Sequence, residues 1–330
     1  MSQKLKIVIT EKFSQIAQIN LQKNNSFELI KLLNITELDQ HITTAEILII
    51  RSKTQITENL LTQAPKLKLI ITCTSGFDHI DLISTQKKNI TVMYTPDANS
   101  QSAAELTWGL VLSAARNINE SHKQIKAGLW NQSSRENLTG TELSGKTYGV
   151  VGLGRIGQKV AQIAKAFGMN VVVFDPYQDD DVFNKLNLKR SSYEEVLKQS
   201  DVMSFHVPAT AETKNMLNRS HFEYINRNLI LVNTSRGSVV HEDDLCLALE
   251  NKWLAAAGLD VFNKEPLSRE SKLLQYPNVI LTQHMGALTH EAFEKASLEA
   301  SELCLNFINK NLTKNTLPLV NEWGSLSFKD

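Results

Sequence analysis

A glycine-rich turn between an apolar strand and a helix constrains this chain more than any other feature. The apolar run that ends at Val151 leads into Gly152-Leu153-Gly154-Arg155-Ile156-Gly157, and a helical pattern follows. Gly152 permits the tight turn, Gly154 lets backbone approach a pyrophosphate, and Gly157 lets the helix pack closely on the strand. Because unpaired N–H groups at a helix start favour an anion, the pattern predicts a dinucleotide-binding βαβ unit.

An acidic residue ends the second strand of this unit. The run Val171-Val172-Val173-Phe174 is followed by Asp175, 18 residues after Gly157, where a carboxylate can accept hydrogen bonds from the adenosine ribose. A 2′-phosphate would meet Asp175 as a like charge, and residues 176–181 contain no Arg or Lys to bind it. We therefore expect NAD rather than NADP as the cofactor. The three acids at 179–181 read as a solvated turn.

Composition and charge exclude several classes of protein. With 330 residues the chain is long enough for two domains, and its 35 basic residues balance its 35 acidic ones. We therefore expect no binding to nucleic acid or to an anionic membrane surface. The three cysteines lack metal-ligand spacing, so we expect no metal site and a reducing, cytoplasmic location. No leader-like start and no apolar run of membrane-spanning length is apparent.

Short apolar runs alternate with helical patterns along the whole chain. Strands are expected at 5–9, 47–50, 67–71, 90–93, 202–207, 229–233, 256–260 and 279–281. Amphipathic helices are expected at 102–127, 242–251 and 289–311, the last of which would carry the chain back to the first domain. Alternating strands and helices indicate parallel, doubly wound sheets.

These patterns predict an α/β protein of two doubly wound parallel-sheet domains. A Rossmann-type NAD-binding domain, residues 98–290, would be inserted into a flavodoxin-like substrate-binding domain formed by residues 1–97 and 291–330. Ligands of such sheets bind outside the carboxyl ends of the strands. The cleft between the two domains is therefore the expected active site.

Three polar residues follow predicted strands of the second domain. Arg236, Glu265 and His284 would lie at one edge of one sheet, beside the dinucleotide site. Taken singly, they also read as a surface arginine, an exposed loop acid and a hydrogen-bonded structural histidine. Together they supply a positive anchor, a group that titrates near neutral pH and a carboxylate to orient it. His206, at the end of another strand, has no acidic partner in its sequence context and is interpreted as structural.

Over nearly its whole length the chain resembles the D-2-hydroxyacid dehydrogenase family, and within it most closely the phosphoglycerate dehydrogenases. The matching stretches are residues 74–81, 99–106, 152–157, 208–213, 233–237, 259–266 and 284–287. One departure is Gln283, where the family usually has proline before the catalytic histidine. This change would loosen the loop but removes no functional group.

The resemblance assigns a role to each candidate residue. Arg236 would bind the substrate carboxylate and polarise the C2 oxygen, His284 would exchange the hydroxyl proton, and Glu265 would hold the imidazole and favour its charged form. The carboxylate would also lie against backbone N–H groups of Ser75 and Gly76. Cofactor contacts are expected at Gly152, Gly154, Arg155, Ile156, Gly157, Asp175, Val207, Thr234, Ser235, Asp260, Gly286 and Ala287.

Arg51 and Lys53 follow a predicted strand. Their positive charges could bind a phosphate on C3, at the end of the substrate away from its carboxylate. Both could equally be plain surface charges. The resemblance therefore implies D-3-phosphoglycerate and 3-phosphohydroxypyruvate as the substrate pair, as in serine biosynthesis. Hydroxypyruvate or glyoxylate reductases and D-lactate dehydrogenases are alternatives, and NAD-sensing corepressors are an alternative of another class. The chain length leaves no room for the regulatory domain that many phosphoglycerate dehydrogenases carry, so feedback control through such a domain is not expected.

The apolar surface expected on the helix at 102–127 and on residues 128–138 predicts self-association. Relatives pair through this region, so we expect a homodimer or a tetramer built from it. Arg135 in this segment is a candidate for reaching a neighbouring active site.

Overall fold

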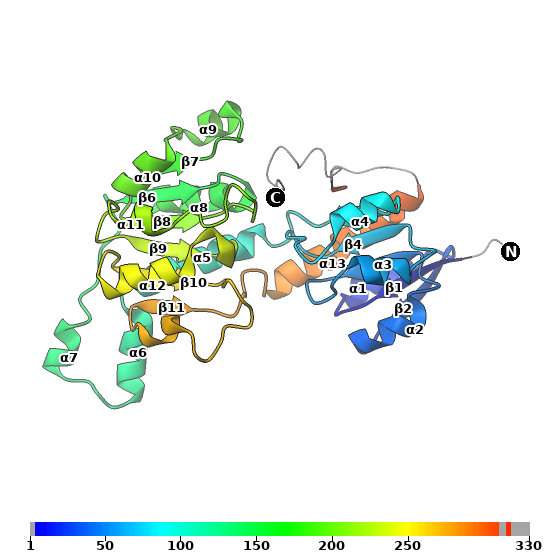
Figure 1. Cartoon of the computed structure of the whole chain (residues 1–330), viewed down its shortest axis with the longest axis horizontal. Coiled ribbons are helices and arrows are strands. Elements are labelled where there is room, and N and C mark those ends of the chain that lie inside the picture. Colours follow the sequence, from blue (N-terminus) through cyan, green and yellow to red (C-terminus); the bar gives the residue numbers. More distant parts are fainter. Residues whose placement is uncertain (1–3, 310–314, 318–330) are drawn as a thin grey trace. The chain divides into compact units, whose positions relative to one another are not determined.

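The computed structural model describes residues 4–309 and 315–317, which form two compact α/β units. The first unit comprises the described residues of Met1–Asn99 and Ala287–Asp330, and the second is Ser100–Gly286 (Figure 1). Within the described part of the chain, no helix combines the length and apolar character needed to cross a membrane.

The first unit is built on a five-stranded parallel sheet of order β2-β1-β3-β4-β5. Its strands are β1 (Leu5–Ile9), β2 (Phe27–Lys31), β3 (Ile47–Ile50), β4 (Leu69–Thr72) and β5 (Thr91–Tyr94). This is the strand order of flavodoxin-like sheets. The edge strand β2 was not among the strands expected from sequence, because only Phe27 in it is fully buried.

Helices cover both faces of the first sheet. Ile7 and Ile9 of β1 pack against α1 (Gln15–Gln22) and the long α13 (His290–Ile308), whereas Val8 points to the opposite face. That face is covered by α2 (Leu38–His41), α3 (Glu58–Thr62) and α4 (Leu82–Lys87), with a 3-10 turn η1 (Ile35–Glu37) before α2. Burial on both faces explains why these strands read as continuous apolar runs.

The second unit contains a six-stranded parallel sheet of order β11-β10-β9-β8-β6-β7. Its strands are β6 (Thr147–Val151), β7 (Asn170–Phe174), β8 (Val202–Phe205), β9 (Ile230–Asn233), β10 (Ala256–Leu259) and β11 (Val279–Leu281). A Rossmann sheet has a further strand outside β7. Here that position holds only an isolated parallel bridge between Val173 and Arg190.

Two helical layers enclose this sheet, as in other doubly wound folds. One layer is α5 (Ser100–Ala115), α8 (Arg155–Ala166) and α9 (Asp180–Leu186). The other is α10 (Tyr193–Gln199), α11 (Arg219–Phe222) and α12 (Glu242–Glu250), with the 3-10 turns η2 (Gly237–Val239) and η3 (Lys272–Gln275) in the connections. Adjacent residues of one strand serve opposite layers, Val150 in the first core and Val151 in the second.

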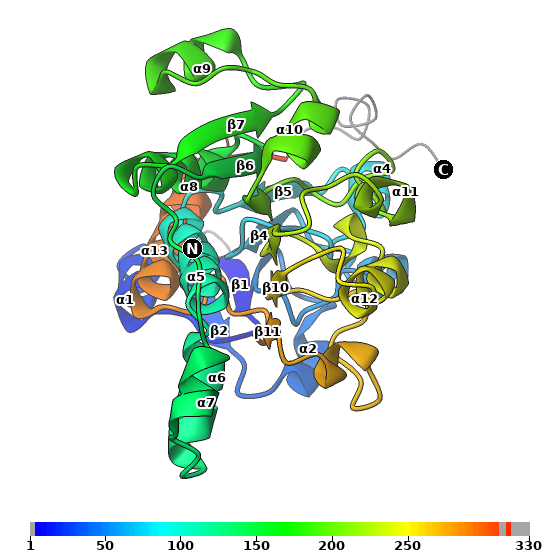
Figure 2. The same cartoon turned by 90° about the vertical axis from the view of Figure 1, so that its left-hand side faces the viewer.

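Two expectations, one about a helix and one about a turn, were wrong in detail. The helix expected at 102–127 is broken, because Asn117 adopts a left-handed conformation with φ +52° between α5 and α6 (Ile118–Lys126). From this break, α6 and the short α7 (Gln132–Glu136) run away from the second sheet in both views (Figures 1 and 2). The acids at 179–181, expected as a solvated turn, are exposed, but Asp180 and Asp181 form the first turn of α9.

Candidate active site

The glycine-rich loop connects β6 to α8, and each glycine meets a different steric demand. Gly152 has φ +94°, and a side chain there would lie 2.6 Å from the carbonyl oxygen of His206. A Cβ on Gly157 would lie 2.0 Å from the carbonyl oxygen of Gly152, so the helix could not approach the strand. At Gly154, the N-cap of α8, the space around a Cβ position is open to 4 Å. These three environments fit a dinucleotide whose pyrophosphate lies over Gly154.

Asp175 links the end of β7 to this loop. One carboxylate oxygen accepts the N–H of Leu153 at 2.7 Å, and the other accepts the N–H groups of Tyr177 and Gln178 at 2.9 and 3.0 Å. The amide of Gln178 returns a hydrogen bond to the Leu153 carbonyl at 2.7 Å. Asp175 remains partly exposed, as a residue that binds ribose hydroxyls must be.

A side-chain link joins the loops that follow β7 and β8. The phenol of Tyr177 donates to the carboxylate of Glu212, and this hydrogen bond is the main reason that the pKa of Tyr177 is raised. Val207, a predicted cofactor contact, lies in the β8 loop and is partly buried against the core.

His206 belongs to a hydrogen-bonded chain inside the sheet. Its Nε2 lies 2.7 Å from the hydroxyl of Ser204, which accepts a hydrogen bond from the phenol of Tyr148 at 2.9 Å. Burial lowers the pKa of His206 to about 3, so the ring is neutral at physiological pH. These contacts support the structural interpretation of this histidine.

Arg236 is carried by a braced turn after β9. The side chain of Asn233 accepts hydrogen bonds from the N–H and hydroxyl of Ser235 at 3.0 and 2.8 Å, and donates to the Arg236 carbonyl at 2.8 Å. The guanidinium donates to the Ser235 carbonyl at 2.7 Å. A Cβ on Gly237 would lie 2.0 Å from the backbone of Phe262, so glycine lets this turn lie against the β10 loop.

His284 and Glu265 form the pair expected from the sequence. Nδ1 of His284 lies 2.7 Å from Oε2 of Glu265, whose other oxygen accepts the N–H of Phe262 at 3.1 Å. The side chains are 50% and 37% exposed, so water screens their interaction. Since Nδ1 is engaged, Nε2 is the ring nitrogen available for proton exchange.

Asp260, expected from the sequence only as a cofactor contact, holds the loop that carries His284. The residue is fully buried, and its carboxylate accepts the hydroxyl of Thr282 at 2.6 Å and the N–H groups of Met285 and Gly286 at 2.8 and 2.9 Å. These bonds clamp both sides of His284, which has φ +49°, an unfavourable conformation for a residue with a Cβ. With the loop held by Asp260, the exposed Gln283 can stand where proline is usual.

The other expected cofactor residues are distributed over the same edge of the second sheet. Thr234 shares a hydroxyl contact of 2.8 Å with Thr107 of α5, Ser235 is buried in the Asn233 turn, and Ile156 packs partly into the core. Arg155 opens α8. Ala287 is the first residue of the second segment of the first unit.

In the first unit, the expected substrate residues follow neighbouring strands β3 and β4. The guanidinium of Arg51 lies 5.3 Å above the ring of Phe293, and its Nη1 is buried without a hydrogen-bond partner among the described residues. Lys53 is exposed. Ser75 and Gly76 lie in the loop after β4, where the hydroxyl of Thr74 donates to the Gly76 carbonyl at 2.6 Å.

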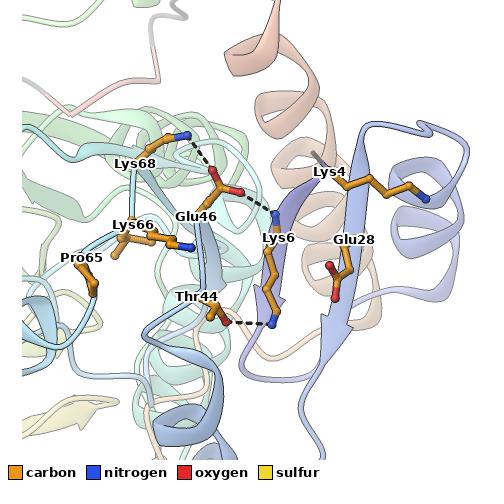
Figure 3. Close-up of a pocket in the computed structure, with 9 residues that line it drawn as sticks. Lys4, Lys6, Glu28, Thr44, Glu46, Pro65, Lys66 and Lys68 are labelled. Carbon is orange, nitrogen blue, oxygen red and sulfur yellow. Dashed lines mark hydrogen bonds and ion pairs between the residues drawn. The ribbon is translucent and has the colours of Figure 1, made fainter. Parts of the chain in front are cut away.

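A hollow of about 710 Å³ lies at the opposite, amino-terminal edge of the first sheet (Figure 3). Part of its charge is internally compensated, because Lys68 forms an ion pair with Glu46 at 2.7 Å. The ammonium group of Lys6 donates to the hydroxyl of Thr44 at 2.9 Å. None of the expected site residues lines this hollow, whose lining is Lys4, Lys6, Glu28, Thr44, Glu46, Pro65, Lys66, Leu67 and Lys68.

Comparison with known proteins identifies relatives of the whole chain. The family model of the NAD-binding domain of D-isomer specific 2-hydroxyacid dehydrogenases matches residues 108–286. The chain is 38% identical over 318 residues to D-3-phosphoglycerate dehydrogenase of Methanocaldococcus jannaschii, covering 96% of this chain and 60% of that protein. It is 36% identical over 261 residues to glyoxylate reductase of Aeropyrum pernix, covering 78% of each.

One solved structure can be aligned over nearly the whole chain. D-lactate dehydrogenase from Aquifex aeolicus, in complex with NAD and lactic acid, has a TM-score of 0.83 at 30% identity and covers 94% of this chain and 98% of its own. By contrast, this chain spans only about three fifths of the phosphoglycerate dehydrogenases that it matches, at 60%, 57% and 59% of their lengths.

Proposed function

Because this chain belongs to the D-isomer specific 2-hydroxyacid dehydrogenases, a family of NAD-dependent oxidoreductases, we propose that it interconverts a D-2-hydroxy acid and its 2-oxo acid. The observation that carries the proposal is the His284–Glu265 contact of 2.7 Å, at the sheet edge that also bears the braced Arg236 and the glycine-rich loop. The second unit is the NAD-binding domain of this family.

In this reaction the protein supplies position and proton transfer. NAD, when bound, supplies the hydride acceptor. Nε2 of His284 takes the C2 hydroxyl proton in oxidation and returns it in reduction, while Glu265 fixes the ring through Nδ1. The guanidinium of Arg236 binds the substrate carboxylate through parallel N–H donors. Asp260 keeps His284 in its unfavourable backbone conformation.

For the substrate we favour D-3-phosphoglycerate and 3-phosphohydroxypyruvate, the pair of serine biosynthesis. The buried Nη1 of Arg51 supports this choice, because it has no hydrogen-bond partner within residues 4–309 and 315–317, and a cationic donor of this kind suits a phosphate oxygen. Lys53 would add a second, exposed cation, and the N–H groups of Ser75 and Gly76 would meet the carboxylate. The glyoxylate reductase relative supports a second candidate, reduction of glyoxylate or hydroxypyruvate.

We also propose that the protein is a cytoplasmic homodimer, or a tetramer built from dimers. The segment 118–130 presents Ile118 at 51%, Ile125 at 51%, Leu129 at 56% and Trp130 at 77% exposure. Apolar side chains gathered on an arm that leaves its own sheet suit a self-complementary interface. A monomer at micromolar concentration by light scattering would contradict this assembly.

A panel of 2-oxo acids assayed with NADH tests the substrate proposal. We expect 3-phosphohydroxypyruvate to give the highest kcat/KM, and Arg51→Ala to raise its KM far more than that of hydroxypyruvate. Lys87→Ala, which removes an exposed lysine of α4 in the same unit, is the control for loss of a positive charge. Faster turnover of glyoxylate or hydroxypyruvate by the unaltered protein would establish the second candidate. NADH binding without turnover of any acid would point instead to a corepressor-like role.

A further inference from the structure

Arg190 occupies an unusual place beside the dinucleotide site. It bridges to Val173 of β7, and the N–H of Ser191 donates to the Val173 carbonyl at 2.7 Å. The bridge replaces the outer strand of a Rossmann sheet. It brings the side chain of Arg190 to the end of β7, from which Asp175 projects, although the two residues are 15 positions apart.

The guanidinium of Arg190 holds the loop that carries the ribose acid. Nη1 donates to the carbonyl of Asp175, and Nη2 donates to the Gln178 carbonyl at 2.6 Å and to a carboxylate oxygen of Asp180 at 2.8 Å. The group also lies 4.4 Å above the ring of Phe183, and the side chain is 36% exposed.

The Asp175 loop is thus fixed from two directions. The carboxylate of Asp175 binds the glycine-rich loop through the N–H of Leu153, while its carbonyl binds Arg190. The sequence led us to attribute NAD preference partly to the absence of a cation after Asp175. That reason was incomplete, because tertiary structure places the Arg190 guanidinium directly on this loop.

We propose that Arg190 is the specificity-determining cation of the cofactor site. While Asp175 is ionised, it repels a 2′-phosphate and Arg190 acts as a positioning residue for the loop. Once the charge of Asp175 is removed, Arg190 becomes the donor that binds the 2′-phosphate of NADP. The fork of guanidinium N–H groups suits a phosphate, and its ties to two carbonyls and to the 85% exposed Asp180 are open to exchange. The inference rests on the proposed NAD-dependent function.

Calorimetric binding of adenosine 2′,5′-bisphosphate and of ADP tests the inference without turnover. Asp175→Asn should bind the 2′-phosphate compound about 10- to 100-fold more tightly than the unaltered protein, as expected for new hydrogen bonds to a charged group. Adding Arg190→Ala should abolish this gain. Adding Lys189→Ala instead removes an exposed neighbouring cation and should leave the gain in place.

Two results would overturn the inference. In one, Asp175→Asn with Arg190→Ala keeps the full gain, so another cation binds the phosphate. In the other, adding Lys189→Ala reduces the gain in affinity as much as adding Arg190→Ala does. The gain would then come from the positive charge of the region and not from contact with Arg190. If Arg190→Ala destabilises the fold in thermal unfolding, Arg190→Gln serves in its place, since a neutral amide still donates to a carbonyl.

The positioning role has its own readout. Arg190→Ala alone should raise the Kd for NADH several-fold while leaving kcat nearly unchanged, and Arg190→Lys should restore only part of the affinity. Failure of the proposed function looks different, since the unaltered protein would then turn over no 2-oxo acid with NADH, whatever the Arg190 variants do to binding. Tight NADH binding with no response to any Arg190 variant would reject the inference alone.

Discussion

Asp175 and Asp260 follow two strands of the same sheet, and both carboxylates accept backbone N–H groups. Asp175 stays partly exposed, and its carboxylate binds both the glycine-rich loop, at Leu153, and the loop that follows Asp175 itself. Asp260 is fully buried, and its carboxylate accepts hydrogen bonds from Thr282, Met285 and Gly286, on both sides of His284. The adenosine end of the site therefore retains an acid that can meet a ligand, whereas the catalytic end uses its acid to fix a loop.

This difference separates two kinds of change. Around His284, substitutions should act on rate and stability, because we propose that the groups there move the proton or hold the residue that does. At the adenosine end, substitutions should act on which cofactor binds. Each of the following variants tests one side of that division.

The largest expected effect belongs to His284→Ala. Removing the group that exchanges the C2 proton should lower kcat by about 10²–10⁴-fold, the usual share of general acid–base catalysis. The Kd for NADH should change little, since the imidazole serves the substrate. Steady-state rates in both directions and NADH fluorescence titration measure the two quantities.

His41→Ala in α2 of the first unit is the matched control for loss of an imidazole and should keep wild-type turnover. Near wild-type turnover in His284→Ala would end the acid–base assignment. His206, despite its neutral ring, would then be the next histidine to test.

Asp260→Ala should have the next largest effect. It leaves the buried N–H of Gly286 and the part-buried N–H of Met285 without an acceptor, which we expect to lower the free energy of unfolding by about 2–4 kcal/mol. Because His284 then loses its support, kcat should fall as well. Asp260→Asn keeps one acceptor oxygen and should lose less of both. Urea unfolding and steady-state turnover of the same variants test whether stability and kcat fall together. An unchanged free energy of unfolding in Asp260→Ala would refute the role of Asp260 in holding the His284 loop.

Asp175→Ala should change cofactor choice rather than rate with NADH. Loss of the charge that repels a 2′-phosphate should raise the ratio of kcat/KM for NADPH to that for NADH by about tenfold or more. Assays with both cofactors at saturating 2-oxo acid give this ratio. An unaltered protein that already uses both cofactors equally would refute the preference itself.

Much of the fold and of the candidate site was predictable from local sequence patterns. Three expected strands, at 5–9, 47–50 and 279–281, have the observed bounds, because short apolar runs leave a plain signal even where, as at 279–281, the strand is only half-buried at a sheet edge. Two of the loop glycines meet the steric demands expected of them, since Gly152 adopts φ +94° and Gly157 leaves room for the helix beside the strand. The His284–Glu265 contact followed from parallel strands that end at one edge.

What sequence reasoning missed depends on tertiary contacts or on single backbone angles. Arg190 reaches Asp175 only because one bridge replaces a strand, which no local pattern indicates. The break between α5 and α6 rests on one left-handed residue, Asn117, inside an otherwise continuous amphipathic pattern. Asp260 was expected only as a ligand contact. The three residues that its carboxylate binds lie more than 20 positions along the chain, so no local pattern links them.

The smallest expected effect tests how strongly Glu265 acts on His284. Reduction needs the imidazolium to donate a proton and oxidation needs the neutral ring to accept one, so reduction should fade with rising pH while oxidation improves. Glu265→Gln keeps a hydrogen-bond acceptor but removes the charge that stabilises the imidazolium. Glu265→Gln should therefore lower kcat/KM for reduction at neutral pH. Because both side chains are substantially exposed, the pair is worth at most about 1 kcal/mol, so the loss should stay below about tenfold. Steady-state rates in both directions measure kcat/KM, and an unchanged or higher value for reduction would reverse the role given to Glu265.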